Sequence, residues 1–117
     1  MADQKDDFEE SFALLRQNYL QAMIGKIQEV ESAWNLVQKA DNPREHLKTL
    51  YLLAHNLSGS GAIYGFSALS DSAHQLEILV KPIHEGGGLP DAAQAQQIHE
   101  LVGRIQADSK VPSAPLA

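Results

Sequence analysis

The chain of 117 residues contains no cysteine, which excludes disulfide bonds, thiolate metal sites and cysteine nucleophiles. Aromatic residues make up only 6% of it, and no apolar run approaches the ~18 residues needed to cross a bilayer. Basic residues are also scarce, since nine Lys and Arg stand against fifteen Asp and Glu, and the net charge is −6. Nucleic acids and anionic membranes both attract basic surfaces. We therefore expect a protein that binds neither nucleic acid nor a membrane.

The two ends of the chain differ in character. The first seven residues are acidic and polar, and they lack the basic and apolar regions of a secretory signal, so we expect a cytoplasmic protein. Residues 111–117 contain two prolines and no apolar period, which is typical of a disordered or linker-like tail. The length suits one domain, predicted over residues 1–110, and a monomer is the simplest expectation.

Apolar residues recur at steps of three and four along four segments, and no segment shows the alternation of a strand. The first stripe runs from Phe8 to Val37 and ends before Asp41-Asn42-Pro43. The second runs from about Pro43 to Tyr64, the third begins near Ser67 and is ended by Pro82 and Gly86–Gly88, and the fourth opens at Pro90-Asp91. The pattern predicts an all-α, antiparallel up-and-down four-helix bundle with a long first helix. We expect the first turns of that helix to overhang and cover one end of the bundle.

His55 lies within the second apolar stripe but off its core face. At ~100° per residue, the apolar residues cluster around Leu50, whereas His55 falls about 140° away. Gly59 and Ala62 fall near it, so its neighbours are small. A helix-interior glycine costs ~1 kcal/mol against alanine, which suggests that bulk beside the histidine had to be removed. The alternative is an ordinary surface histidine, with Gly59 packing against a neighbouring helix.

Other kinds of site find little support. No Glu-x-x-His, His-x-x-x-His or His-Glu-x-x-His spacing occurs, so we predict no metal site. No Gly-x-x-x-x-Gly-Lys segment occurs, which argues against ATP binding. No acidic cluster is expected on the face of His55. Of the remaining histidines, His46 and His84 are expected to be solvated, His74 to lie on the surface and His99 at a boundary position.

The spacing of seven residues across two predicted helices resembles the signature of histidine-containing phosphotransfer (HPt) domains. The matching residues are His55, Leu57, Gly59, Gly65, Leu69, Leu76 and Glu77. The family usually carries a lysine three residues after the histidine, where its charge is thought to favour the phosphoryl group. Here that residue is Ser58, which offers a hydroxyl without charge.

The resemblance implies a phosphorelay carrier rather than an enzyme. His55 would accept a phosphoryl group from the aspartyl phosphate of a response-regulator receiver domain, and could pass it on or back. Ser58 and Gly59 would surround the phosphoryl group. The partner would be a receiver domain, a hybrid histidine kinase, or both, and Mg²⁺ would be held by the receiver, so that this chain needs no cofactor of its own. The residues expected to dock the partner are Leu52, Ala62, Ile63, Phe66 and Tyr19. The alternative for the larger of these side chains, Phe66 above all, is ordinary packing in the core or at a helix end.

A second function stays open because Ser58 replaces the usual lysine. The same bundle could be an interaction module that carries no phosphate, docks on a receiver or kinase and inhibits it.

Overall fold

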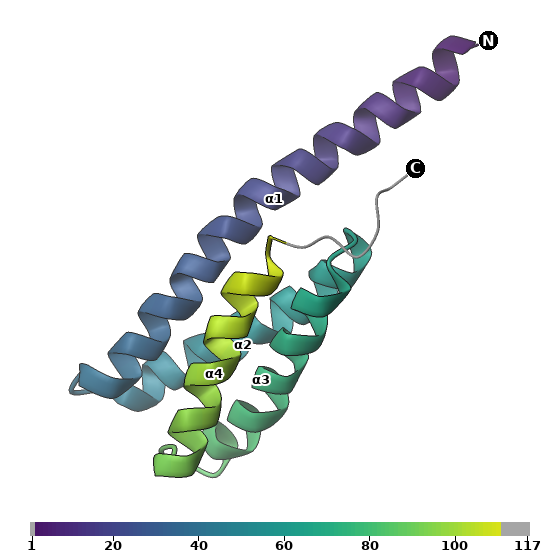
Figure 1. Ribbon diagram of the computed structural model, residues 1–117. Helices are drawn as coiled ribbons and strands as arrows, with labels where there is room; N and C mark the ends of the chain where they lie inside the picture. Colours follow the sequence, from purple (N-terminus) through teal and green to yellow (C-terminus); the bar gives the residue numbers. More distant parts are fainter. Residues whose placement is uncertain (1, 111–117) are drawn as a thin grey trace.

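The computed structural model describes residues 2–110, with side chains from residue 7 onward. Four helices follow one another: α1 (Ala2–Lys39), α2 (Pro43–Ile63), α3 (Ser67–Glu85) and α4 (Ala92–Asp108). Consecutive helices run in opposite directions, and no strand occurs within residues 2–110 (Figure 1). The predicted all-α four-helix bundle is therefore confirmed. The tail predicted at residues 111–117 lies outside the described residues.

The core runs along the axis of the bundle and draws on all four helices. Each neighbouring pair packs together, most extensively α2 with α3 and least extensively α1 with α4. The most deeply buried large side chains are Met23, Val30, Leu47, Leu50, Leu57, Leu69, Leu76, Val80, Ile98 and Ile105. Fully burying one such side chain contributes roughly 1.5–3 kcal/mol, so these stripes account for why the helices hold together.

Helix α1 is much longer than its partners and sets the overall shape. At ~1.5 Å per residue, its 38 residues span most of the long axis of the molecule, which measures 59 × 22 × 20 Å. Its N-terminal turns project past the other helices and do not fold over the end of the bundle (Figure 1). The expectation that they cover that end was wrong.

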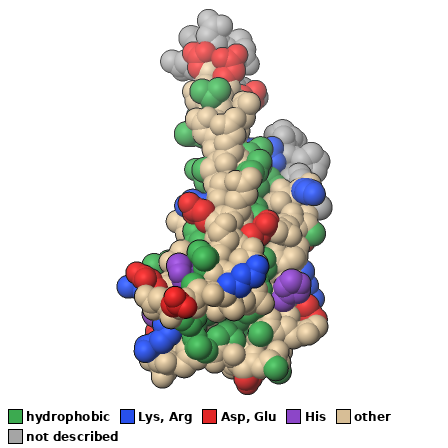
Figure 2. Space-filling view, turned by 90° about the vertical axis from the view of Figure 1, so that its left-hand side faces the viewer, with side chains coloured by type: hydrophobic (Ala, Val, Ile, Leu, Met, Phe, Trp, Pro, Cys, Tyr) green, Lys and Arg blue, Asp and Glu red, His purple; other side chains and the backbone are tan. Residues whose placement is uncertain are grey.

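The projecting part of α1 leaves hydrophobic side chains in solvent. Figure 2 shows it as a narrow column that stands clear of the rest of the molecule, with hydrophobic groups visible along its sides. Phe8 is 71% exposed and Leu14 and Leu15 are also exposed, because the other described helices end short of them. The apolar stripe of α1 therefore continues beyond the core that covers its C-terminal half.

An aromatic cluster marks the point where α1 leaves the bundle. The rings of Tyr19 and Tyr64 stack with centroids 4.1 Å apart, and Phe66 lies 6.4 Å from Tyr19. The Arg16 guanidinium lies over the Phe66 ring at 5.9 Å. Stacked aromatic pairs contribute ~0.5–1.5 kcal/mol beyond their buried area. This cluster fixes α1 against the α2–α3 turn.

The helix ends follow the predicted turn residues, with one correction. Asp91 caps α4, since its side chain accepts from the Gln94 backbone N–H while the Gln94 side chain accepts from the Asp91 N–H. Pro82 does not end α3, which continues to Glu85 before Gly87 adopts a positive φ. Proline removes one N–H bond, to the carbonyl of residue 78. Both Ile78 and Pro82 are exposed, so water can hydrate that carbonyl.

The α2–α3 turn depends on close approach of the two helices. A Cβ on Gly61 would lie only 3.3 Å from the Phe66 carbonyl oxygen, and the Ser70 hydroxyl donates to the Ser58 carbonyl oxygen at 2.5 Å. Gly65 makes the turn with φ +86°, a left-handed conformation that is easy for glycine alone. These contacts set the register in which side chains of α2 face those of α3.

We expect Gly65→Ala to lower the free energy of unfolding by ~1–2 kcal/mol, because an L-residue is strained at this φ. Gly59→Ala is the matched control, since Gly59 lies inside α2 and a methyl group added there would meet no atom within 4 Å. It should raise the same free energy by up to ~1 kcal/mol through helix propensity. Urea unfolding of both variants measures the two shifts, and equal shifts of one sign would contradict this explanation of the turn.

Candidate functional site

His55 lies in the middle of α2 on an exposed face of the helix. Its side chain is 67% exposed, whereas Ala54, directly before it, and Leu57, two residues after it, are fully buried in the core. The helix period produces this contrast, because successive residues point ~100° apart. The predicted exposure of the imidazole is therefore present in the structure.

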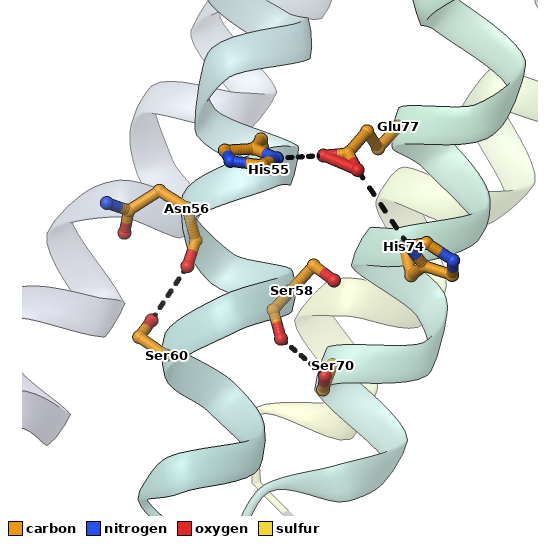
Figure 3. Close-up of polar contacts among 7 residues, drawn as sticks. All are labelled: His55, Asn56, Ser58, Ser60, Ser70, His74 and Glu77. Carbon is orange, nitrogen blue, oxygen red and sulfur yellow. Dashed lines mark hydrogen bonds and ion pairs between the residues drawn. The ribbon is translucent and has the colours of Figure 1, made fainter.

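Glu77 reaches the imidazole from the neighbouring helix. Nδ1 of His55 is hydrogen-bonded to Oε2 of Glu77, whose side chain is only 14% exposed (Figure 3). No acidic side chain was predicted beside His55, so this single carboxylate is a partner that the sequence analysis missed. Glu77 was identified only as part of the family signature, and its contact with His55 was not predicted. The register of α3 against α2 brings the two side chains together.

The contact with Glu77 determines which ring nitrogen is free. An ionised carboxylate can only accept hydrogen bonds, so Nδ1 carries the proton and donates it. A neutral imidazole then carries its lone pair on Nε2. In Figure 3 this second nitrogen lies on the edge of the ring turned away from α3. The site thus presents one nucleophilic nitrogen outward.

His74 lies on the other side of the same carboxylate. Its Nδ1 is 3.8 Å from Oε1 of Glu77, one turn earlier on α3, and its side chain is 57% exposed. Glu77 therefore lies between two imidazoles, with the closer contact to His55 (Figure 3). The surface position predicted for His74 agrees with this geometry.

His84 was expected to be solvated but is half-buried. Its ring stacks with Tyr51 at a centroid distance of 6.3 Å, and Tyr51 lies equally far from the His55 ring. The Tyr51 ring is thus a neighbour of both imidazoles at the α2–α3 boundary. This row of rings supports His55 from the side away from the α2–α3 turn.

Ser58 lies half-buried on the α3 side of α2. Its carbonyl accepts the Ser70 hydroxyl, and its own side chain is directed toward α3 (Figure 3). Within the described part of the chain, Glu77 and not Ser58 is the polar partner of the imidazole. The role of Ser58 near a phosphoryl group stays a prediction.

Gly59 leaves open space one turn after His55. A Cβ at this position would meet no atom within 4 Å, so Gly59 does not pack against a neighbouring helix. The alternative explanation of Gly59, as a glycine that packs against a neighbouring helix, is therefore wrong. Leu52, Ala62 and Ile63 are also exposed on α2 and form an apolar fringe around the glycine.

Two of the expected docking residues lie away from this exposed face. Phe66 is only 3% exposed and belongs to the core, so its prediction as a docking residue was wrong. It caps the α2–α3 turn, where a large ring fills the end of the bundle.

Tyr19 is half-buried, and its hydroxyl is 3.1 Å from that of Ser60. Burial raises the pKa of the Tyr19 phenol above its ordinary value, against the opposing effect of the Ser60 hydrogen bond. A docking role for Tyr19 stays a prediction.

A lysine of α1 also borders the exposed face. Nζ of Lys26 donates to Oδ1 of Asn56 at 2.7 Å, directly beside His55 in the chain. The Asn56 carbonyl in turn accepts the Ser60 hydroxyl (Figure 3). The sequence did not predict this pair, because no local pattern reports which residue of α1 faces which residue of α2.

The described residues contain no group of three or more His, Asp or Glu side chains that could hold a metal ion. None of the described helices is long and apolar enough to span a membrane.

Comparison with known proteins agrees with the geometry. The Hpt domain family model matches residues 14–108, which span the bundle and part of the projecting half of α1. No curated protein and no solved structure matches the chain. The family match covers most of the sequence and includes the helix that carries His55 as well as the helix that carries Glu77. The chain therefore belongs to the Hpt domain family, whose members carry phosphoryl groups in the phosphorelays of two-component signalling.

Proposed function

We propose that His55 is the residue that carries the phosphoryl group, accepting it at Nε2 from the aspartyl phosphate of a receiver domain. The observation that carries this proposal is the exposed imidazole, hydrogen-bonded through Nδ1 to Glu77 so that Nε2 is left open. His99 is also exposed, with the open Gly103 one turn after it, so the glycine alone does not distinguish His55. Of the five histidines, His55 alone is hydrogen-bonded to a carboxylate within the described residues.

The transfer is a displacement at phosphorus. The Nε2 lone pair forms the new N–P bond while the bond from phosphorus to the aspartate oxygen breaks, and its electron pair returns to the aspartate carboxylate. The imidazole keeps its Nδ1 proton and becomes positively charged. The Glu77 carboxylate stabilises that charge, since hydrogen bonds with an ionised partner are about twice as strong as neutral ones. The reverse reaction returns the phosphoryl group along the same path.

Most of the catalysis in such a transfer comes from positioning and charge neutralisation. We expect the receiver to supply the Mg²⁺ and the carboxylates that bind it. The HPt chain contributes the nucleophile, its proton partner and an open approach over Gly59. It is therefore a carrier in the relay and needs no nucleotide site.

The partner is expected to dock on the exposed face of α2. Leu52, Ala62 and Ile63 provide apolar contact area around the imidazole, and Gly59 lets the partner's backbone approach closely. Exposed apolar patches on an otherwise polar surface mark sites of interaction with other proteins.

Incubation with a phosphorylated receiver domain tests the acceptor. The wild type should gain an acid-labile, alkali-stable label, and His55→Gln should gain none, because glutamine has no nucleophilic nitrogen. His74→Gln is the matched control, since His74 is also exposed beside Glu77 and should keep the label. A stable complex without any label would instead support the non-phosphorylated inhibitory module, which stays open because Ser58 replaces the usual lysine. Label on His55→Gln would contradict the proposal.

Gly59→Leu should block transfer while leaving the fold intact. A Cβ at this position would meet no atom of a neighbouring element within 4 Å, so we expect helix content to be kept and the free energy of unfolding to rise by up to ~1 kcal/mol. The transfer rate should fall about tenfold or more, which is ~1.4 kcal/mol of barrier. Gly103→Leu gives the control, because Gly103 is equally open on α4, which does not pack against α2. A normal rate in Gly59→Leu would show that the glycine does not serve access.

Glu77→Gln should slow transfer about tenfold, because a neutral amide stabilises the imidazolium less than a carboxylate does. Stopped-flow transfer rates measure this, and ¹⁵N NMR of His55 reports whether Nδ1 keeps the proton. Glu100→Gln on α4 makes the same change in net charge at an exposed position and should transfer at the wild-type rate. Unchanged kinetics and an unchanged tautomer in Glu77→Gln would remove Glu77 from the mechanism.

A further inference from the structure

Lys26 is held beside the acceptor histidine by a single polar contact. Its ammonium donates to the side-chain oxygen of Asn56 at 2.7 Å, and Asn56 directly follows His55 on the exposed face of α2. The two residues are 30 positions apart, so the contact exists only because α1 packs along α2. Lys26 is half-buried, so part of its stem lies against the bundle.

The partner of this ammonium is a neutral amide. Among the described residues, no carboxylate lies within 4.0 Å of Lys26, and the ion pairs found there join Glu77 to His55 and His74. An ammonium has three N–H donors, and Asn56 uses one. In a chain of net charge −6 with fifteen acidic residues, Lys26 thus faces an amide and, among the described residues, has no carboxylate within ion-pair distance. It is available to an anion that arrives nearby.

The geometry of His55 indicates where such an anion would be. Nδ1 faces Glu77 on α3, so Nε2 lies on the opposite edge of the ring and points away from α3 (Figure 3). In the same view Asn56 lies on that side of His55, and Lys26 approaches Asn56 from α1. A phosphoryl group on Nε2 would therefore be added on the side that α1 flanks.

A phosphoryl group carries about −1.5 to −2 charges near pH 7. Glu77 cannot neutralise it, since a carboxylate repels it. The flexible four-carbon stem of lysine lets the ammonium move from Asn56 to phosphoryl oxygens without movement of the backbone. Because Asn56 accepts through Oδ1, its Nδ2 group remains a second donor on the exposed face.

We propose that Lys26, held in place by Asn56, supplies the positive charge that stabilises the phosphoryl group on Nε2 of His55. The inference rests on the proposed function, since it needs His55 to be the acceptor. Glu77 and Lys26 then divide the charges of the phosphorylated site between them: the carboxylate stabilises the imidazolium from α3, and the ammonium stabilises the phosphoryl oxygens from α1.

The equilibrium between phosphorylated receiver and phosphorylated HPt chain tests this proposal. That equilibrium depends on the free end states and not on how the two proteins dock, so a residue that only shapes the docking surface cannot move it. Lys26→Gln should shift the equilibrium toward the receiver about two- to fivefold, the size of an exposed charge pair. The shift should shrink as NaCl is raised to ~1 M, where the Debye length is ~3 Å.

Two further variants serve as controls. Lys26→Arg keeps the charge and should keep the wild-type equilibrium. Lys39 is exposed on the same helix, more than three turns from Lys26, so Lys39→Gln makes the same change in net charge and should leave the equilibrium unchanged. Thermal unfolding of each variant checks that the bundle is intact.

The outcomes separate the two proposals. If His55 is labelled in every variant and Lys26→Gln has the wild-type equilibrium at low salt, the role of Lys26 is overturned and the proposed function stands. If Lys26→Gln and Lys39→Gln shift the equilibrium equally, net charge and not position is responsible, and the proposal also fails. If the wild type itself takes no label, the proposed function fails and the role of Lys26 falls with it.

Discussion

The hydrogen bond between His55 and Glu77 depends on the register of two helices. Neither side chain could hold the other if α3 were shifted by one residue along α2, because each residue turns the helix face by ~100°. That register is set at the turn between them, by the close approach at Gly61, the bond from Ser70 to the Ser58 carbonyl and the left-handed Gly65. The buried leucines of both helices then keep them together. A surface site thus takes its geometry from the core beneath it.

The site is chemically sparse, which suits a carrier. The proposed nucleophile, His55, is exposed on a rigid helix, and its hydrogen-bond partner Glu77 comes from a second helix and is mostly buried. Rigid elements hold functional groups more accurately than loops do. The metal ion and the phosphodonor belong, by our proposal, to the receiver. By the same proposal, transfer can run in either direction, since the same groups stabilise the charge however the phosphoryl group arrives.

Much of the fold could be predicted from the sequence, because the helix period is a local property. The apolar stripes indicated four helices, and Asp41-Asn42-Pro43, Gly65 and Asp91 marked three of their boundaries. Pro82 was misleading. A proline leaves one helix carbonyl without its N–H partner, but on the exposed side of a helix water can bind that carbonyl, so the helix need not end there. Phe66 was also misjudged, since it lies in the turn after α2, where the helix period does not indicate which side chains are buried.

The candidate site could be predicted only as far as one helix extends. His55 and the cleared turn at Gly59 followed from positions on α2 alone. The contacts with Glu77 and Lys26 join residues 22 and 30 positions apart, and they depend on how three helices pack. A spacing pattern can bring Glu77 to attention, as the family signature does, but it does not show which atoms meet. For Lys26 no such pattern exists.

The projecting half of α1 has a consequence for how the molecule opens. Every residue from Phe8 to Leu15 is exposed, and an isolated helical segment of this length is only marginally stable in water. This segment is therefore helical because it continues the turns of α1 that follow Tyr19, and those turns pack in the core. Amide hydrogens of α1 should therefore exchange at graded rates, fastest in its N-terminal turns and slowest around the buried Val30. Exchange would occur by local fraying at one end of this helix and by global unfolding in its core half.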